Sequence, residues 1–404
     1  MTKTYNPIYF LAALGNGGLA VSFFMYFMFM VPHPDTPMAT FNHIFPYLMN
    51  GSLLVQAGIV TAVIGMIYFT IRHFQKLFWN LSEWKTFKQS DAYEKMRGTN
   101  AEASFMAVPL TLSMTVNVLF VLGAVFVPNL WNVIQLLLPF SLAAFAAIGV
   151  YALTLFIPMM TRFFTDNGFK MEANNNFSQL LPVFAFTMIA VGLAAPAAMS
   201  TVTFVSATGM ILSILFLTVA AGLLVIQGTL ALASIFKNGI AKEGSATVWI
   251  LIPILTLVGI TFVRLASGVS HNLLATDPSP VMMFIVLGAI LSVQTFVGLF
   301  GYSVLRRNGY FAEFTNGEGK SPGSYGLICP GVAYFVLGMF FVQWGLVDTG
   351  IVTKFSLTYF LILTPLVLIQ LKTIQVLGKL NLKHFGKEAI QSDSKLSGQT
   401  AKAS

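Results

Sequence analysis

The sequence contains a single cysteine, whose thiol could carry chemistry. Cys329 directly precedes Pro330, and no internal disulfide can form from a single thiol. One hypothesis is a redox function, because a thiolate can be oxidised to a sulfenic acid. The alternative is a buried cysteine that packs as a small hydrophobic residue. No second cysteine is present that could resolve an oxidised thiol.

Two polar residues inside long apolar stretches could act on anions. Arg264 would raise the local anion concentration at the mouth of a passage, or its side chain would extend to a membrane interface. Asn117 could donate a hydrogen bond to an anion or to a neighbouring helix. No carboxylate lies in the middle of an apolar stretch, and Asp348 is the nearest. This absence favours passive permeation over tightly proton-coupled exchange.

Metal, haem and nucleotide chemistry find little support in the sequence. Haem between membrane helices needs axial ligands within the helices. We expect all five histidines in loops or at helix ends, namely His33, His43, His73, His271 and His384. The segment Gly319-Lys320-Ser321 ends like a phosphate-binding loop, but Phe314 stands where that loop needs a glycine. We therefore predict no metal, no cofactor and no enzymatic activity.

The elements that would position these residues are membrane helices. Of the 404 residues, 56% are hydrophobic and 9% are charged, against roughly a quarter charged in soluble domains. About 20 apolar residues cross a bilayer as a helix, and ten such stretches predict an all-α integral membrane protein. They are Ile8–Val31, Pro46–Ile71, Phe105–Val127, Val133–Met160, Leu180–Met199, Val202–Ile235, Ala246–Val263, Val281–Leu305, Gly326–Leu346 and Phe355–Leu377.

The basic residues are distributed unevenly among the predicted loops. With a cytoplasmic N-terminus, 20 of the 22 lysines and arginines lie on the inner side, and only Arg264 and Lys354 lie outside. The positive-inside rule then places both termini in the cytoplasm, in an inner (cytoplasmic) membrane. Topology and contact with the lipid bilayer explain the net charge of +8, so we expect no nucleic-acid partner.

We predict one membrane domain over residues 1–381 and a disordered cytoplasmic tail over 382–404. Within the domain, residues 73–103 form the longest inner loop, where aromatic residues and leucines recur at helical spacing between lysines. This pattern predicts an amphipathic helix at the membrane interface.

Proline positions indicate an internal repeat. Each odd-numbered span has a proline near its start, and the separations are 102, 73, 71 and 77 residues. This spacing predicts five helical hairpins, with kinks where the prolines remove backbone hydrogen bonds. The prolines are Pro7, Pro109, Pro182, Pro253 and Pro330.

Alignment on these prolines predicts a face of small residues on the odd-numbered helices. Positions eight and fifteen beyond each proline carry only small or short polar residues, and two helical turns separate them. One interpretation is close packing of neighbouring helices; the other is a central pore lined by the small face. The predicted pore-lining residues are Gly15, Ser22, Asn117, Ala190, Thr261, Gly268, Gly338 and Gly345.

The arrangement of ten spans and five prolines resembles the superfamily of TehA (tellurite-resistance) and slow-anion-channel proteins, which includes C4-dicarboxylate transporters. The segment from Tyr325 to Gly331 is similar to the TsoY family within that group, some members of which carry selenocysteine. The resemblance implies five hairpins around a central pore, obstructed by an aromatic residue on the ninth span, and a homotrimer or other homo-oligomer. Phe341 would be this gate and Phe120 falls in the same aligned column, with Phe335 and Phe340 as rivals.

The sequence therefore leads us to expect a channel or transporter that passes small inorganic or organic anions through a pore gated by an aromatic side chain. The alternative is a membrane anchor or redox subunit that exchanges electrons with quinone or a selenium- or sulfur-linked partner through Cys329.

Overall fold

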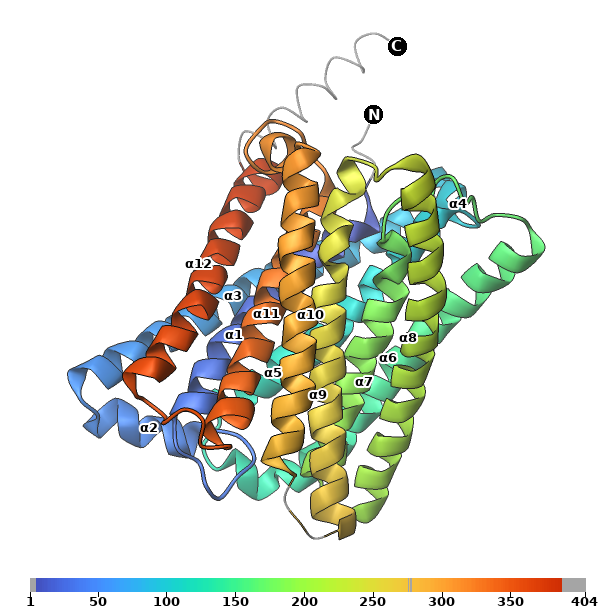
Figure 1. Ribbon diagram of the computed structural model, residues 1–404. Helices are drawn as coiled ribbons and strands as arrows, with labels where there is room; N and C mark the ends of the chain where they lie inside the picture. Colours follow the sequence, from blue (N-terminus) through green and yellow to red (C-terminus); the bar gives the residue numbers. More distant parts are fainter. Residues whose placement is uncertain (1–4, 275, 277, 387–404) are drawn as a thin grey trace.

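The computed structural model describes residues 5–274, 276 and 278–386, and this part of the chain folds into helices without a strand. Figure 1 shows the long helices crossing the molecule side by side. The α-helices are α1 (Phe10–Met30), α2 (Phe41–Asn50), α3 (Leu53–Phe87), α4 (Asp91–Met96), α5 (Ala107–Phe126), α6 (Leu130–Thr165), α7 (Leu181–Met199), α8 (Thr203–Asn238), α9 (Leu251–Val269), α10 (Pro280–Arg307), α11 (Ile328–Phe340) and α12 (Leu357–Phe385).

Ten helices of the described chain are long and apolar enough to cross a membrane, with mean hydropathies of 1.6 to 2.6. Each overlaps one of the ten predicted spans, as expected for a multi-pass membrane protein. The largest difference concerns the second span. It begins at Leu53 rather than Pro46, because Pro46 lies in the separate helix α2, which ends before Gly51.

The amphipathic helix predicted within residues 73–103 is the continuation of α3, which runs unbroken to Phe87. Its Leu77, Trp84 and Phe87 are buried against the protein, while Phe78 is 64% exposed. The helical periodicity was thus predicted correctly, but its apolar face packs on neighbouring helices. At the other end of the chain, α12 extends to Phe385, beyond the predicted domain end at 381. Residues 387–404 of the predicted tail lie outside the described residues.

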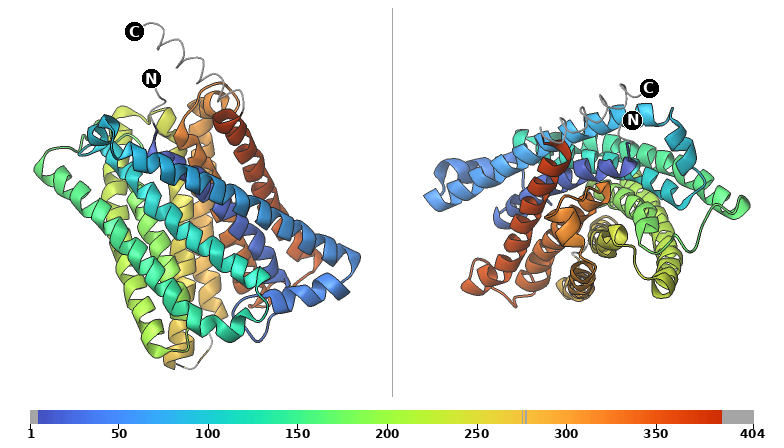
Figure 2. Two further views of the ribbon diagram at one scale, coloured as in Figure 1. Left: turned by 180° about the vertical axis from the view of Figure 1, so that it is seen from behind. Right: turned by 90° about the horizontal axis from the view of Figure 1, so that it is seen from above.

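Burial alternates along the chain. In the most apolar stretch of each spanning helix, 56% to 100% of residues are buried in α1, α5, α7, α9 and α11, but 22% to 28% in α3, α6, α8, α10 and α12. We call the first set the inner helices and the second set the outer helices. Seen from above, the outer helices α3, α8 and α12 lie at the rim of the bundle (Figure 2).

The inner helices contact one another in a closed sequence. Helix α1 contacts α5 and α11, while α7 contacts α5 and α9, and α9 contacts α11. Each outer helix contacts the inner helix that precedes it in the chain: α3 lies on α1, α6 on α5, α8 on α7, α10 on α9 and α12 on α11.

Every inner helix begins with a 3₁₀ turn. These turns are Pro7–Tyr9, Asn100–Met106, Ser178–Leu180, Glu243–Ile250 and Pro322–Leu327. The repeated prolines therefore lie at the helix starts: Pro109, Pro253 and Pro330 are third in their α-helices and Pro182 is second. The first-turn N–H groups of an α-helix have no partner within it, so proline fits there without the loss of an α-helical hydrogen bond. Kinks at these four prolines stay a prediction.

The opposite ends of two inner helices are irregular. Helix α9 continues as a π-helical turn over Ser270–Leu274, and α11 continues as one over Phe341–Val347. Short π-helical segments are rare and occur frequently at functional sites. We call this the π end of the bundle, and the end with the 3₁₀ turns the 3₁₀ end. The Tyr9 hydroxyl lies 3.1 Å from His384 Nδ1, so α1 begins and α12 ends at the 3₁₀ end.

Candidate functional site

A cavity of about 970 Å³ lies among the five inner helices, and each of them contributes lining residues. We call it the large cavity. Its lining along α9 extends from Pro253 to His271, a distance of about 27 Å at the α-helical rise. At the π end it is bordered by the loop from Val31 to Met38 and by Asp348 and Lys354.

A second cavity of about 370 Å³ opens at the 3₁₀ end. We call it the small cavity. Its lining comes from the first turns of all five inner helices and is rich in short polar side chains, namely Asn6, Asn100, Ser104, Asn176, Ser178, Thr247 and Ser321.

The two cavities meet at three shared residues, Phe184, Pro253 and Cys329. These lie in the first turns of α7, α9 and α11, next to the repeated prolines. Phe184 is 4% exposed and is the largest of the three side chains. It is therefore the bulkiest of the side chains that border both cavities.

Arg264 is the cation inside the large cavity. Its Nη1 donates a hydrogen bond to the carbonyl oxygen of Val191 on α7 at 2.7 Å. None of the ion pairs formed by the described residues includes Arg264. A guanidinium has five N–H donors, so most of its donor capacity remains for another acceptor.

His33, in the loop that borders the large cavity at the π end, lies next to His43 in the first turn of α2. His43 Nε2 lies 3.0 Å from Asp35 Oδ1, and the hydrogen bond lowers the pKa of this carboxyl group. His33 Nδ1 lies 2.7 Å from the carbonyl oxygen of Val31, yet burial dominates and lowers the pKa of His33. His33 is therefore neutral at pH 7.

Asp348 and Lys354 border the same opening. Burial raises the pKa of Asp348 and lowers that of Lys354, and each charge partly offsets the shift of the other. Asp348 also accepts a hydrogen bond from Gln343 Nε2 at 2.8 Å. These two residues place one positive and one negative charge at the opening.

Of the eight predicted pore-lining residues, only Gly15 and Asn117 line the large cavity. The other six pack against protein, so for them the close-packing interpretation agrees with the structure. A Cβ atom on Gly268 would lie 2.7 Å from the carbonyl oxygen of Ala197, and one on Gly338 would lie 2.6 Å from Leu366 on α12. The alignment column holds small residues because helices approach closely there.

Of the remaining four, two contact a neighbouring helix and two contact their own helix. Ser22 accepts a hydrogen bond from Gln370 on α12, and the carbonyl of Ala190 accepts one from Ser213 on α8. The Thr261 hydroxyl donates to the carbonyl of Leu257 in its own helix, and Gly345 packs on Phe341.

The predicted gate Phe341 faces α10 rather than the cavity. Its ring centroid lies 5.8 Å from that of Phe284, and its ring borders Gly288. Phe341 is not among the lining residues of the large cavity, whereas Phe120 and Phe340 are. Phe184, which sequence reasoning missed, is the aromatic residue that borders both cavities, and no local signal in the sequence distinguishes it.

Cys329 is 8% exposed and lies where the cavities meet, so its proposed redox function is neither supported nor contradicted by its position. The histidine prediction is wrong for His73, which is fully buried within α3. Its Nδ1 lies 2.8 Å from the Ala13 carbonyl oxygen and its Nε2 lies 3.0 Å from the Thr115 hydroxyl. Both ring nitrogens therefore have protein partners. No group of metal-binding side chains occurs among the described residues.

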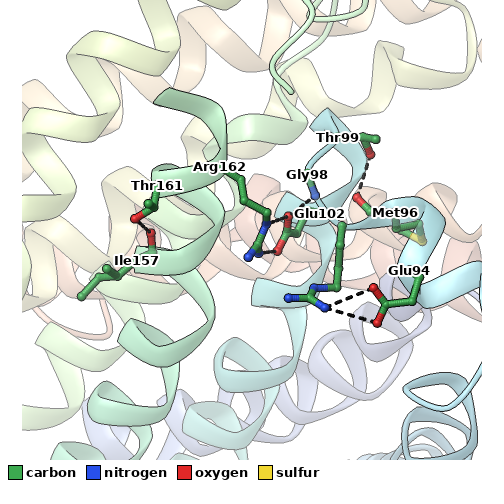
Figure 3. Close-up of polar contacts among 9 residues, drawn as sticks. Glu94, Met96, Gly98, Thr99, Glu102, Ile157, Thr161 and Arg162 are labelled. Atoms are coloured by element: carbon green, nitrogen blue, oxygen red, sulfur yellow. Dashed lines mark hydrogen bonds and ion pairs between the residues drawn. The ribbon is translucent and has the colours of Figure 1, made fainter. Parts of the chain in front are cut away.

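A buried ion pair that the sequence did not reveal lies beside the small cavity. Glu102, in the 3₁₀ turn before α5, pairs with Arg162 near the end of α6 and also accepts the backbone N–H of Gly98 at 2.6 Å. Figure 3 shows these contacts, with the guanidinium facing the carboxylate. Glu102 is 3% exposed. The pair fastens α6 to the wall of the small cavity.

Comparison of the chain with protein-family models, with curated proteins and with solved structures finds no match. The likeness to the TehA and slow-anion-channel superfamily therefore remains a prediction made from the sequence.

Proposed function

We propose that this protein passes small anions across a membrane through a conduit formed by the large and small cavities. The observation that carries the proposal is that the cavities enter the same ring of inner helices from opposite ends and share Phe184, Pro253 and Cys329. On this view the ten helices act as five hairpins around a central pore, as in a channel or transporter.

Positive potential supports anions over cations as the permeant species. Arg264 lines the large cavity without a carboxylate partner among the described residues. The five inner helices all begin at the small cavity, and each helix start carries a partial positive charge. These two features favour anions, while Asp348 beside Lys354 at the π end and the exposed Glu243 at the small cavity each add one negative charge.

An aromatic gate remains part of the proposal, with Phe184 in place of Phe341. A bulky apolar side chain in a narrow passage excludes water and ions until it moves. The first turn of α7 holds Phe184 in place, and Pro182 lies in the same turn.

The membrane and its orientation follow from charge. The 3₁₀ end carries the basic loops, and we propose that it faces the cytoplasm of a cell whose inner membrane holds the protein. Homo-oligomers, including a trimer, remain part of the proposal because the outer helices leave large apolar faces exposed.

Anion flux tests the proposal. Purified protein in liposomes should carry chloride or nitrate, measured with an anion-sensitive dye inside the vesicles. Phe184→Ala should raise the flux by about tenfold or more, equivalent to about 1.4 kcal/mol of barrier. Phe341→Ala is the matched control and should leave the flux unchanged. Absence of flux from both wild type and Phe184→Ala, with correctly folded protein, would refute the conduit.

A further inference from the structure

The walls of the large cavity are unusual for a passage that serves small hydrated ions. Seven methionines line it, and aromatic side chains such as Phe24, Phe120 and Trp344 stand between them. The methionines are Met25, Met28, Met38, Met114, Met188, Met199 and Met283. Thioether side chains are polarisable and adapt to apolar molecules of different shape, but they cannot replace the water around a small ion.

The size of the cavity points the same way. At about 970 Å³ it lies at the upper end of the range for small-molecule sites, which are mostly apolar with a few polar groups that fix orientation. An inorganic anion would occupy a small part of this volume. An organic molecule would also cover the apolar walls.

The charged side chains that line the cavity could together neutralise one negative charge on a ligand. Among the lysines, arginines and carboxylates that line the cavity, Arg264 and Lys354 are cationic and Asp348 is anionic, while His33 is neutral at pH 7. Two positive charges less one negative charge leave a net charge of +1. Asp348 and Lys354 stand together at the opening, so the uncompensated charge is that of Arg264.

Arg264 is placed to bind a carboxylate. It occupies the same face of α9 as Ser267 and His271, three and seven residues further along, and all three line the cavity. Its contact with the Val191 carbonyl fixes one end of the guanidinium fork. The remaining N–H donors of the guanidinium match the two oxygens of a carboxylate.

We propose that the large cavity binds a monovalent organic acid, with its carboxylate on Arg264 and its apolar body against the methionine and aromatic walls. The proposal rests on the proposed function in that this anion would be the transported species. It narrows the substrate to amphipathic monocarboxylates, because a second carboxylate would lie against apolar walls, away from Lys354, which stands beside Asp348 at the opening.

Binding to the full-length protein in lipid nanodiscs tests the site, with benzoate as the probe. Benzyl alcohol is its uncharged counterpart, and malate and chloride are the competing anion classes. Calorimetric titration should show saturable benzoate binding, with at least about tenfold weaker binding of the other three. That ratio corresponds to about 1.4 kcal/mol.

Three variants test the charge of Arg264 and the apolar cavity wall separately. Arg264→Gln should weaken benzoate binding about tenfold or more, since hydrogen bonds to charged groups contribute about 1.5–3 kcal/mol. Arg307→Gln, an exposed arginine at the end of α10, is the matched control and should bind like wild type. Met28→Gln should weaken benzoate binding and leave chloride binding unchanged. Thermal unfolding of each variant identifies any loss that comes from misfolding.

The outcomes distinguish this site from the conduit. Equal affinity for benzoate and benzyl alcohol, or unchanged benzoate affinity in correctly folded Arg264→Gln, would overturn the site. Chloride or malate binding as tightly as benzoate would show that the apolar walls do not discriminate between anions. This result would also overturn the proposed site. Chloride flux without benzoate binding would leave the conduit standing alone, whereas benzoate binding without any flux would keep the site and refute the conduit.

Discussion

The two cavities share three residues but present different chemistry. In the small cavity most polar lining groups already have protein partners: Asn100 exchanges hydrogen bonds with the backbone of Lys170, and Thr247 accepts the N–H of Phe177. In the large cavity the lining is mostly apolar, but Arg264 has one backbone partner and no ion pair among the described residues. A cavity rich in polar residues is therefore not necessarily the one able to bind a charge.

Two partly buried arginines show this contrast. Arg162 neutralises Glu102 beside the small cavity, whereas Arg264 has no such partner in the large one. One arginine stabilises the fold, and the other is available to a ligand. The predictions below test this division.

The largest effect is expected for Arg162→Gln. It would leave the carboxylate of Glu102 buried without its cation, which costs about 3–5 kcal/mol. The free energy of unfolding in mild detergent should fall by that order. Arg97→Gln, which breaks the exposed pair with Glu94, is the control and should cost less than about 1 kcal/mol. Equal stability of the two variants would contradict the division.

Gly268→Ala should destabilise the fold by about 1–3 kcal/mol through overpacking, because the new Cβ would meet the Ala197 carbonyl oxygen. Unfolding measurements check the loss. Gly222→Ala, where nothing lies within 4 Å of the new Cβ, serves as the control and should be neutral or slightly stabilising. If Gly268→Ala instead narrowed the conduit without loss of stability, the small face would line the pore after all.

Arg264→Gln should lower anion flux about tenfold, the equivalent of about 1.4 kcal/mol, with little loss of stability because no carboxylate loses a partner. Liposome flux assays and unfolding measurements on the same preparation check both halves. Asn100→Ala in the small cavity should lower the stability and leave the anion flux unchanged, since the hydrogen bonds of Asn100 hold the loop at Lys170. A fall in stability for Arg264→Gln equal to that for Arg162→Gln would remove the contrast.

The smallest effect concerns pH. Burial lowers the pKa of His33 below its ordinary value of 6.5, so the neutral form is favoured in the folded protein. Its contribution to stability is therefore present above pH 6.5 and is lost as pH falls through the lowered pKa. Unfolding measured from pH 7.5 to 4.5 should show this loss in wild type and a smaller loss in His33→Gln. Identical pH profiles would show that His33 does not titrate in this way.

The ten spans could be predicted because apolar length is a local property of the sequence. The helical character of residues 74–87 was also visible, but not that Leu77 and Trp84 pack on protein rather than on lipid. Hydrophobic periodicity shows that a face is apolar; it does not identify what covers that face.

The five prolines do lie at the starts of the inner helices, but the meaning of their spacing needed three-dimensional contacts. Small residues at Gly268 and Gly338 fit a lumen and a tight helix contact equally well, and only the positions of Ala197 and Leu366 decide between them. Phe184 could not be singled out among 38 phenylalanines, because its position depends on where five helix starts converge. Glu102 and Arg162 are 60 residues apart, so their pairing has no local signal.

Helix α7 has one further consequence. All of the residues in its most apolar stretch are buried, yet its hydropathy of 2.0 is close to the 2.2 of the outer helix α6. In the finished fold α7 has exchanged its lipid neighbours for protein ones, so its apolar character serves mainly its entry into the bilayer during synthesis. A helix of this kind must be stable in lipid until its neighbouring helices have been inserted. This requirement constrains the order in which the chain assembles.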